Sequence, residues 1–161
     1  MERTSLPSHV QGNWIWSARQ RQEADSYVFF RRTFTLDEIP SSVELWIAAR
    51  SFCHLFINGT HLSYVLNTCP SRGSYVFYYD IEYLLGTGEN TIAILAHNTN
   101  VARSSCRRQP HGLWCQLDID DRPALYTDKG WRFMDASCFV RNRPRRSQST
   151  GFIEKLDLRA L

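Results

Sequence analysis

The sequence predicts an all-β fold, and three observations support this. Apolar and polar residues alternate along several short segments, which is the period of a strand with one buried face. No segment keeps apolar residues at helical spacing for more than a turn or two. Turn residues such as Asn58-Gly59 separate the alternating segments. Many short strands joined by turns favour an antiparallel β-sandwich or jelly roll over a single open sheet.

Five segments carry the alternation. Asn58-Gly59 tolerates the positive φ of a two-residue hairpin, so residues 61–65 are expected to return along residues 55–57. In the last segment, Trp114, Gln116 and Asp118 fall on the opposite, polar face. The residues predicted to share an apolar face are, in chain order, Val28, Phe30, Phe34 and Leu36; Val43, Leu45 and Ile47; Leu55 and Ile57; Ile92, Ile94 and Ala96; Leu113, Cys115, Leu117 and Ile119.

The stretch from Tyr78 to Asn98 combines a short apolar turn, a Gly-Glu-Asn turn and a strand. Asp80 is placed to cap the helical turn with its carboxylate, because such side chains accept backbone N–H bonds at helix starts. Gly86 and Gly88 are expected to supply the unrestricted backbone that ends the turn.

Length and charge limit the function classes. The chain has 161 residues with 43% apolar content, enough for one domain with a real core. The formal net charge is only +3, which does not favour a nucleic-acid partner. No apolar run is long enough to span a bilayer, and Met1 to Pro7 carries no hydrophobic signal region. A β-sandwich domain is expected over residues 1–140, followed at 141–161 by a basic linker and the start of a connection to a further domain.

Cysteine usage favours a reducing, cytoplasmic location. The five cysteines include no Cys-x-x-Cys pair and cannot all pair within one chain, so neither a structural zinc site nor a disulfide framework is expected. Asn58-Gly59-Thr60 matches a glycosylation acceptor, but the hairpin turn is the preferred interpretation.

Several segments together resemble a known family. They are Trp14-Ile15-Trp16, residues 30–36 (FRRTFTL), Phe56-Ile57-Asn58-Gly59, residues 80–97, His111-Gly112-Leu113-Trp114, residues 127–131 (TDKGW) and residues 151–159 (GFIEKLDLR). In order and spacing they resemble the N-terminal β-sandwich of bacterial α-L-rhamnosidases, over nearly the whole chain.

This resemblance implies a galactose-binding-like jelly roll that acts as an accessory domain, with the catalytic domain of the same polypeptide as its partner. Such glycosidases use a pair of carboxylates. No convincing pair is found, because Asp118, Asp120 and Asp121 lie in a segment typical of a strand end entering a turn. No catalytic residue, cofactor or metal ligand is therefore assigned, and a structural calcium ion is left open.

Two long connections, residues 67–75 and 97–112, are the expected place for a site. A sugar stacks its apolar face on an aromatic ring while polar side chains bind its hydroxyls. Trp14 and Trp16 are expected instead to be a buried anchor, and His97 and His111 alone are weak metal candidates. The candidate glycan contacts are Trp114, His111, Arg72, Tyr75 and Asn98.

Other function classes stay open. The chain could be an autonomous carbohydrate-binding module or a purely structural interaction domain. A basic patch for an anionic polymer is a weaker alternative, and so is nucleophilic catalysis by Cys106 or Cys115. The arginines of the basic patch would be Arg103, Arg107, Arg108, Arg141, Arg143, Arg145 and Arg146.

Overall fold

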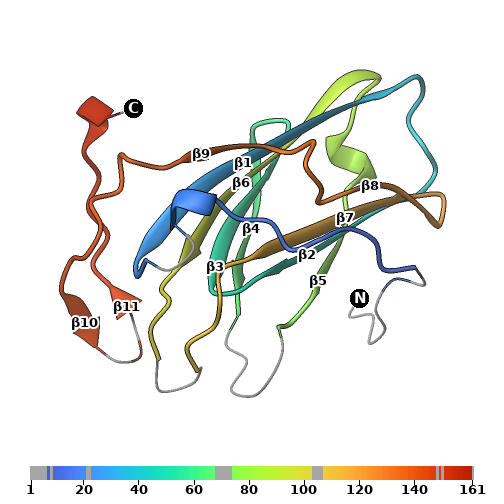
Figure 1. Cartoon of the computed structure of the whole chain (residues 1–161). Coiled ribbons are helices and arrows are strands. Elements are labelled where there is room, and N and C mark those ends of the chain that lie inside the picture. Colours follow the sequence, from blue (N-terminus) through green and yellow to red (C-terminus); the bar gives the residue numbers. More distant parts are fainter. Residues whose placement is uncertain are drawn as a thin grey trace.

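In the computed structural model, two antiparallel sheets pack face to face (Figure 1). The structure describes residues 7, 9–20, 23–67, 74–102, 107–147, 149 and 151–160. One sheet has the strand order β4-β3-β6-β1-β9 and the other β5-β2-β7-β8. The strand bounds are β1 Ser26–Leu36, β2 Val43–Ala49, β3 Phe52–Ile57, β4 Thr60–Leu66, β5 Phe77–Asp80, β6 Gly88–Asn98, β7 Leu113–Ile119, β8 Arg122–Tyr126 and β9 Arg132–Asp135. The predicted all-β sandwich is confirmed.

The core lies between the sheets and is built from the predicted alternating residues. Strands β1 and β6 pair over eleven residues, from Ser26 opposite Asn98 to Leu36 opposite Gly88. The inward residues of β1, β2, β3, β6 and β7 form one buried cluster, as the alternation predicts. Phe34 and Ile119 are only partly buried, because both lie toward strand ends.

Strands β2 and β7 are buried on both faces, which the sequence did not predict. All seven residues of β2 are buried, and so are the first six of β7. Trp114 and Gln116 do share the face opposite the core, but they are 6% and 0% exposed. The backbone of residues 9–13 covers this face: Gln116 accepts a hydrogen bond from Gln11 N (2.7 Å) and donates one to His9 O (2.8 Å). The predicted polar face is therefore an interior one.

Two tight hairpins lie in segments interpreted as turns, and the one at Asn58-Gly59 was predicted as a hairpin. Between β3 and β4, Asn58 and Gly59 adopt φ of 49° and 81°. Between β7 and β8, Asp120 and Asp121 adopt φ of 48° and 63°. Two successive positive φ angles match the right-handed twist of the flanking strands. The turn interpretation of both segments is confirmed.

The expected cap at Asp80 is wrong. The 3-10 turn η2 (Glu82–Leu84) begins after Ile81 and has no side-chain cap. Asp80 is the last residue of β5, and its carboxylate accepts a hydrogen bond from the Tyr78 hydroxyl. Gly88 does have a positive φ of 86°, whereas Gly86 is not among the glycines with positive φ.

The N-terminal strand segment closes one side of the sandwich. Ile15 forms an isolated bridge with Leu113, and Trp16 is 8% exposed in the core. Trp14 is 42% exposed, so the prediction of a buried anchor is right for Trp16 and wrong for Trp14. The Trp14 ring lies outside the core, where the Arg50 guanidinium sits 3.9 Å from its centroid.

The last part of the chain returns to the sandwich. A small hairpin, β10 (Arg145–Ser147) with β11 (Gly151–Phe152), lies beside the two sheets (Figure 1). Val140 N donates to Lys155 O (2.8 Å), and Phe139 bridges Leu156. The domain boundary at residue 140 stays a prediction. The helices among the described residues are η1 (Ala18–Gln20), η2 and η3 (Leu158–Ala160), and none could cross a membrane.

Gly12 permits the close approach of the N-terminal segment, and we expect Gly12→Ala to destabilise the fold. Its φ is +86°, and an added Cβ would lie 2.9 Å from Thr127 O. Strain and contact together should lower the free energy of unfolding by about 2 kcal/mol. Urea unfolding measures this cost. Gly59→Ala is the matched control, since Gly59 has φ +81° but open space around it. Equal costs in the two variants would show that the contact with Thr127 contributes nothing.

Candidate functional site

The described residues of the two long connections lie at one end of the sandwich, at the bottom of Figure 1, where Arg50 Nη1 donates to both Ser74 Oγ (3.1 Å) and Gln109 Oε1 (3.5 Å). This end carries the start of β1, the β2–β3 turn and the connections after β4 and β6. Asn67 N donates to Ser51 O (2.8 Å) and Asn67 Nδ2 to Ala49 O (2.9 Å), which ties the β4 end to the β2–β3 turn. The use of these connections as a site stays a prediction.

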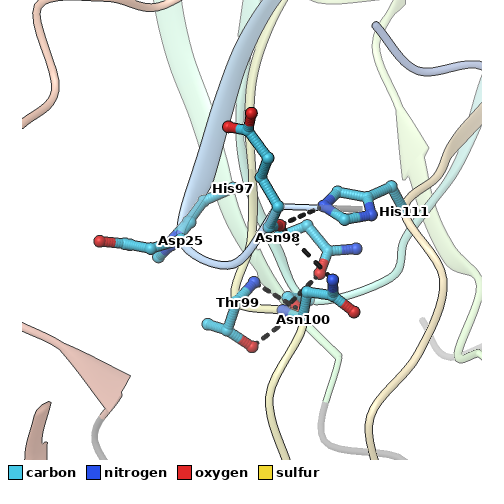
Figure 2. A network of polar contacts seen from close by, with 8 residues as sticks. Asp25, His97, Asn98, Thr99, Asn100 and His111 are labelled. Atoms are coloured by element: carbon cyan, nitrogen blue, oxygen red, sulfur yellow. Dashed lines mark hydrogen bonds and ion pairs between the residues drawn. The ribbon is translucent and has the colours of Figure 1, made fainter. Parts of the chain in front are cut away.

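A polar network joins the start of β1 to the end of β6 (Figure 2). His97 Nε2 is hydrogen-bonded to Asp25 Oδ1 at 3.0 Å, and Asp25 is 1% exposed with φ of 54°. The His97 ring stacks on Tyr27 (3.9 Å between centroids), and Tyr27 also stacks on Phe139 (4.3 Å). Burial, with Asp25 nearby, raises the pKa of the Tyr27 hydroxyl, which stays protonated. His97 thus has a structural role here.

The other part of the network organises the connection after β6. His111 Nε2 donates to Glu23 O (2.8 Å), and Asn98 Nδ2 donates to Pro110 O (3.3 Å). Asn98 Oδ1 accepts a hydrogen bond from the backbone of Asn100 (2.7 Å), whose φ is 46°. Asn100 Oδ1 in turn accepts one from Arg108 Nε (2.9 Å). These contacts tie the described residues on both sides of this connection to one another.

The predicted glycan contacts that the structure describes differ widely in exposure. His111 and Asn98 lie in the same network, but Asn98 is 1% exposed and already bonded through both ends of its amide. Trp114 is buried and donates Nε1 to Gln11 O (2.7 Å), so its ring offers no open stacking face. Tyr75 is 52% exposed, and Arg72 lies outside the described residues. Their role in sugar binding stays a prediction.

Three arginines of the basic patch considered above bind neighbouring parts of the chain. Arg141 forms an ion pair with Glu23, Arg108 bonds Asn100, and Arg145 Nη2 donates to Ala102 O (3.1 Å). These contacts fasten residues 141–145 to the loop end of the sandwich. Arg103 lies outside the described residues.

The cysteines that the structure describes are buried free thiols. Burial raises the pKa of Cys53 and of Cys115, which keeps both thiols protonated and unreactive. Cys115 lies in the core as predicted, and Cys106 lies outside the described residues. Within the described part of the chain, no group of three or more His, Cys, Asp or Glu side chains could hold a metal ion.

The three aspartates considered as a catalytic pair have structural contacts. Asp118 is 5% exposed and accepts a hydrogen bond from Gln116 Nε2 (2.8 Å). Asp120 accepts one from Ser41 Oγ (3.0 Å), and Asp121 is a turn residue. The strand register also places Asp118 and Asp80 beside Glu44 on the two strands that neighbour β2. The sequence analysis missed this row of three carboxylates.

Asp118 makes stability depend on pH. Burial raises the pKa of the Asp118 carboxyl in the folded state. The contribution of this group to the free energy of unfolding is therefore fully present below the unfolded pKa of 3.8, and it is lost as the pH rises through the folded pKa. We expect Asp118→Asn to stabilise the protein more at neutral pH than at about pH 3.5. Thermal unfolding of variant and wild type at several pH values measures this. Glu38→Gln, at an exposed position between β1 and β2, is the control; a constant difference between Asp118→Asn and the wild type would contradict the expectation.

A second candidate site, which sequence analysis missed, lies beside β9. It is a hollow of about 340 Å³ between the N-terminal segment and the β8–β9 connection. Trp14 and Phe133 are its exposed rings, at 42% and 55%. The sequence signal for this site is the pair Trp14 and Trp16, of which only Trp16 is the buried anchor that the pattern predicts. The lining residues are Asn13, Trp14, Ile15, Trp16, Phe30, Asp128, Lys129, Trp131 and Phe133.

The two packed antiparallel sheets define an all-β sandwich domain of the galactose-binding-like kind. Among solved structures, the GH78 family rhamnosidase of Bacillus sp. GL1 contains a similar domain, with a TM-score of 0.87 and 28% sequence identity. The match covers 93% of this chain but 16% of the Bacillus chain. The chain therefore resembles a β-sandwich domain of GH78 α-L-rhamnosidases, which confirms the resemblance inferred from its sequence.

More distant matches share the fold. An α-L-rhamnosidase of Streptomyces avermitilis, solved with L-rhamnose, has a TM-score of 0.57 and 20% identity over 77% of this chain and 12% of its own. A lectin of Pleurotus ostreatus, solved with GalNAc, has a TM-score of 0.54 and 19% identity over 83% of this chain and 40% of its own. No protein-family model matches the sequence, and a comparison with curated protein sequences finds no similar one.

Proposed function

We propose that this chain is a non-catalytic accessory domain of a glycoside hydrolase of the α-L-rhamnosidase type. The observation that carries the proposal is the match to the Bacillus rhamnosidase, which spans 93% of this chain and 16% of that enzyme. In this role the domain packs against a catalytic domain of the same polypeptide, positions it and contributes to holding the glycan. The absence of a cofactor and a cytoplasmic location stay predictions.

The contacts of the acidic residues support a non-catalytic role. Glycoside hydrolysis needs two carboxylates on either side of the scissile bond, about 5 to 9.5 Å apart, in a site that admits the sugar. Glu44 and Asp118 are each 5% exposed, which leaves no room for a sugar between them. Asp120 and Asp121 form a hairpin turn.

The proposal is tested by assaying the purified chain with a chromogenic α-L-rhamnoside. We expect no hydrolysis above the rate in buffer, because no carboxylate pair is assigned. Hydrolysis that co-purifies with the chain and is lost in Glu44→Gln or Asp118→Asn would contradict the proposal and make this chain the catalyst.

An autonomous carbohydrate-binding module is the second candidate, favoured by the open aromatic hollow beside β9. The two functions differ in what the isolated chain does. An autonomous module remains monomeric and binds a glycan by itself, whereas an accessory domain depends on its neighbour and gains stability when joined to it. Sedimentation and glycan titration of the isolated chain separate the two.

A further inference from the structure

Phe133, in the hollow beside β9, lies on the core-facing side of its strand but is not covered by other core residues. β9 is an edge strand, paired only with β1 in its sheet. Trp131 and Phe133 are two residues apart and share a face, and Trp131 is buried in the core at 5% exposure. Phe133 lies 6.3 Å from the core ring of Phe30, yet it is 55% exposed. The core-facing aromatic side chains thus extend from buried Phe30 to exposed Phe133 at this edge of the sheet.

The hollow has the size and lining of a small-ligand site. Its volume of about 340 Å³ lies at the lower end of the range for such pockets. Five aromatic side chains line it: Trp14, Trp16, Phe30, Trp131 and Phe133. The Trp14 ring is held in place by Arg50 and by Gly112, where an added Cβ would lie 2.7 Å from Trp14 Cε3. A preformed ring loses little conformational entropy when a ligand stacks on it.

The rim of the hollow is polar and carries both charges. Asp128 keeps 40% of its side chain exposed, while its Oδ1 accepts a hydrogen bond from Gly130 N (2.8 Å) and faces Arg32 at 3.9 Å. Lys129 and Asn13 are exposed. A carboxylate accepts hydrogen bonds, an ammonium donates them and an amide does both. The rim therefore offers both donors and acceptors, as a ligand with many hydroxyls requires.

We infer that this hollow binds a single neutral pyranose unit, stacked against Trp14 and Phe133 with its hydroxyls on Asp128, Lys129 and Asn13. A pyranose combines an apolar C–H face with polar edges, which matches aromatic walls under a mixed polar rim. The inference rests on the proposed carbohydrate-related function and moves the site from the loop end of the sandwich to its β9 edge.

The tryptophans provide a direct test. Trp14, Trp16 and Trp131 line the hollow, whereas Trp46 and Trp114 do not. The protein is titrated with L-rhamnose, methyl α-L-rhamnopyranoside and N-acetylgalactosamine while the five indole N–H signals are followed by NMR. We expect at least one sugar to shift the indole signals of Trp14, Trp16 or Trp131 and to leave those of Trp46 and Trp114 unchanged.

Two neighbouring exposed residues provide matched variants. Phe133→Ala removes a stacking ring, and Met134→Ala changes the opposite face of the same strand at 62% exposure. Both should fold, because surface substitutions change stability by about 0.5 kcal/mol or less. We expect Phe133→Ala to weaken sugar binding about tenfold, the loss of one stacked ring, and Met134→Ala to leave it within about twofold.

Other outcomes overturn the inference. Sugar binding that shifts Trp114 and is insensitive to Phe133→Ala would place the site elsewhere and leave the accessory function standing. No binding of any of the three sugars would also overturn the inference, while the hydrolysis assay tests the accessory function independently. Self-association that Phe133→Ala abolishes, without sugar binding, would identify the occupant of the hollow as protein.

Discussion

Replacing Asn90 with alanine is expected to lower the free energy of unfolding by about 3 kcal/mol or more, because several buried hydrogen bonds depend on its amide. Asn90 is 1% exposed. Its Nδ2 donates to Gly86 O (2.7 Å) and Gly88 O (3.1 Å), and its Oδ1 accepts from Gly86 N (3.0 Å) and Asn58 Nδ2 (2.8 Å). The amide thus holds the turn before β6 and links it to the β3–β4 hairpin.

Urea unfolding of Asn90→Ala measures this effect, with Glu89→Ala, an exposed neighbour in the same strand, as the control. Asn58→Ala should also destabilise the protein, since Asn58 Nδ2 donates to Leu84 O (2.9 Å) and its Oδ1 accepts from Thr91 N (2.8 Å). The double variant should cost less than the sum of the single ones, because the two amides bond each other. A cost for Asn90→Ala no larger than that of Glu89→Ala would show that the network is not structural.

Replacing Gln116 with leucine is expected to release the N-terminal segment and to cost about 2 kcal/mol or more of stability, since a buried leucine leaves three hydrogen-bonding partners unpaired. Gln116 is 0% exposed and bonds Gln11 N, His9 O and Asp118 Oδ1. Without these bonds the backbone of residues 9–13 loses its main attachment to β7. Trp114 would then become accessible.

Unfolding in urea gives the cost, and faster hydrogen exchange of the Trp114 indole N–H reports the release. Gln11→Ala is a sharp control, because Gln11 uses only its backbone N–H and C=O in this contact and its side chain is exposed. Gln11→Ala should therefore resemble the wild type. Unchanged exchange at Trp114 in Gln116→Leu would mean that other contacts hold the segment.

The strands could be predicted because alternation reports directly on a half-buried sheet. Val28 and Phe30 in β1, or Ile92 and Ile94 in β6, each face the core as the pattern requires. The Asn58-Gly59 hairpin was predictable as well, since both residues tolerate positive φ, whereas Asp120-Asp121 was predicted only as a turn.

The segments that cover the outer face of a sheet could not be predicted from the alternation of apolar and polar residues. Trp114 and Gln116 alternate as polar-face residues do, but a segment a hundred positions earlier covers them. The predicted capping role of Asp80 is wrong, because its carboxylate accepts a hydrogen bond from the hydroxyl of Tyr78 on the same strand. Such contacts depend on tertiary packing, which local sequence does not specify.

The candidate site shows the same limit. The sequence analysis placed a site on the long connections, but local pattern does not indicate that Asn98 bonds Pro110 O or that His111 bonds Glu23 O. The hollow beside β9 combines residues 13–16, 30 and 128–133, three segments that come together only through strand order. Trp14 and Phe133 become neighbours in one site for that reason alone.

The most direct test of the account is a chimera in which this chain replaces the matched 16% of the Bacillus sp. GL1 rhamnosidase. The account predicts a soluble chimera that hydrolyses a chromogenic α-L-rhamnoside, while the Bacillus enzyme without its matched domain is insoluble or inactive. A chimera that folds but stays as inactive as the deletion variant would contradict an accessory role of this domain in a rhamnosidase.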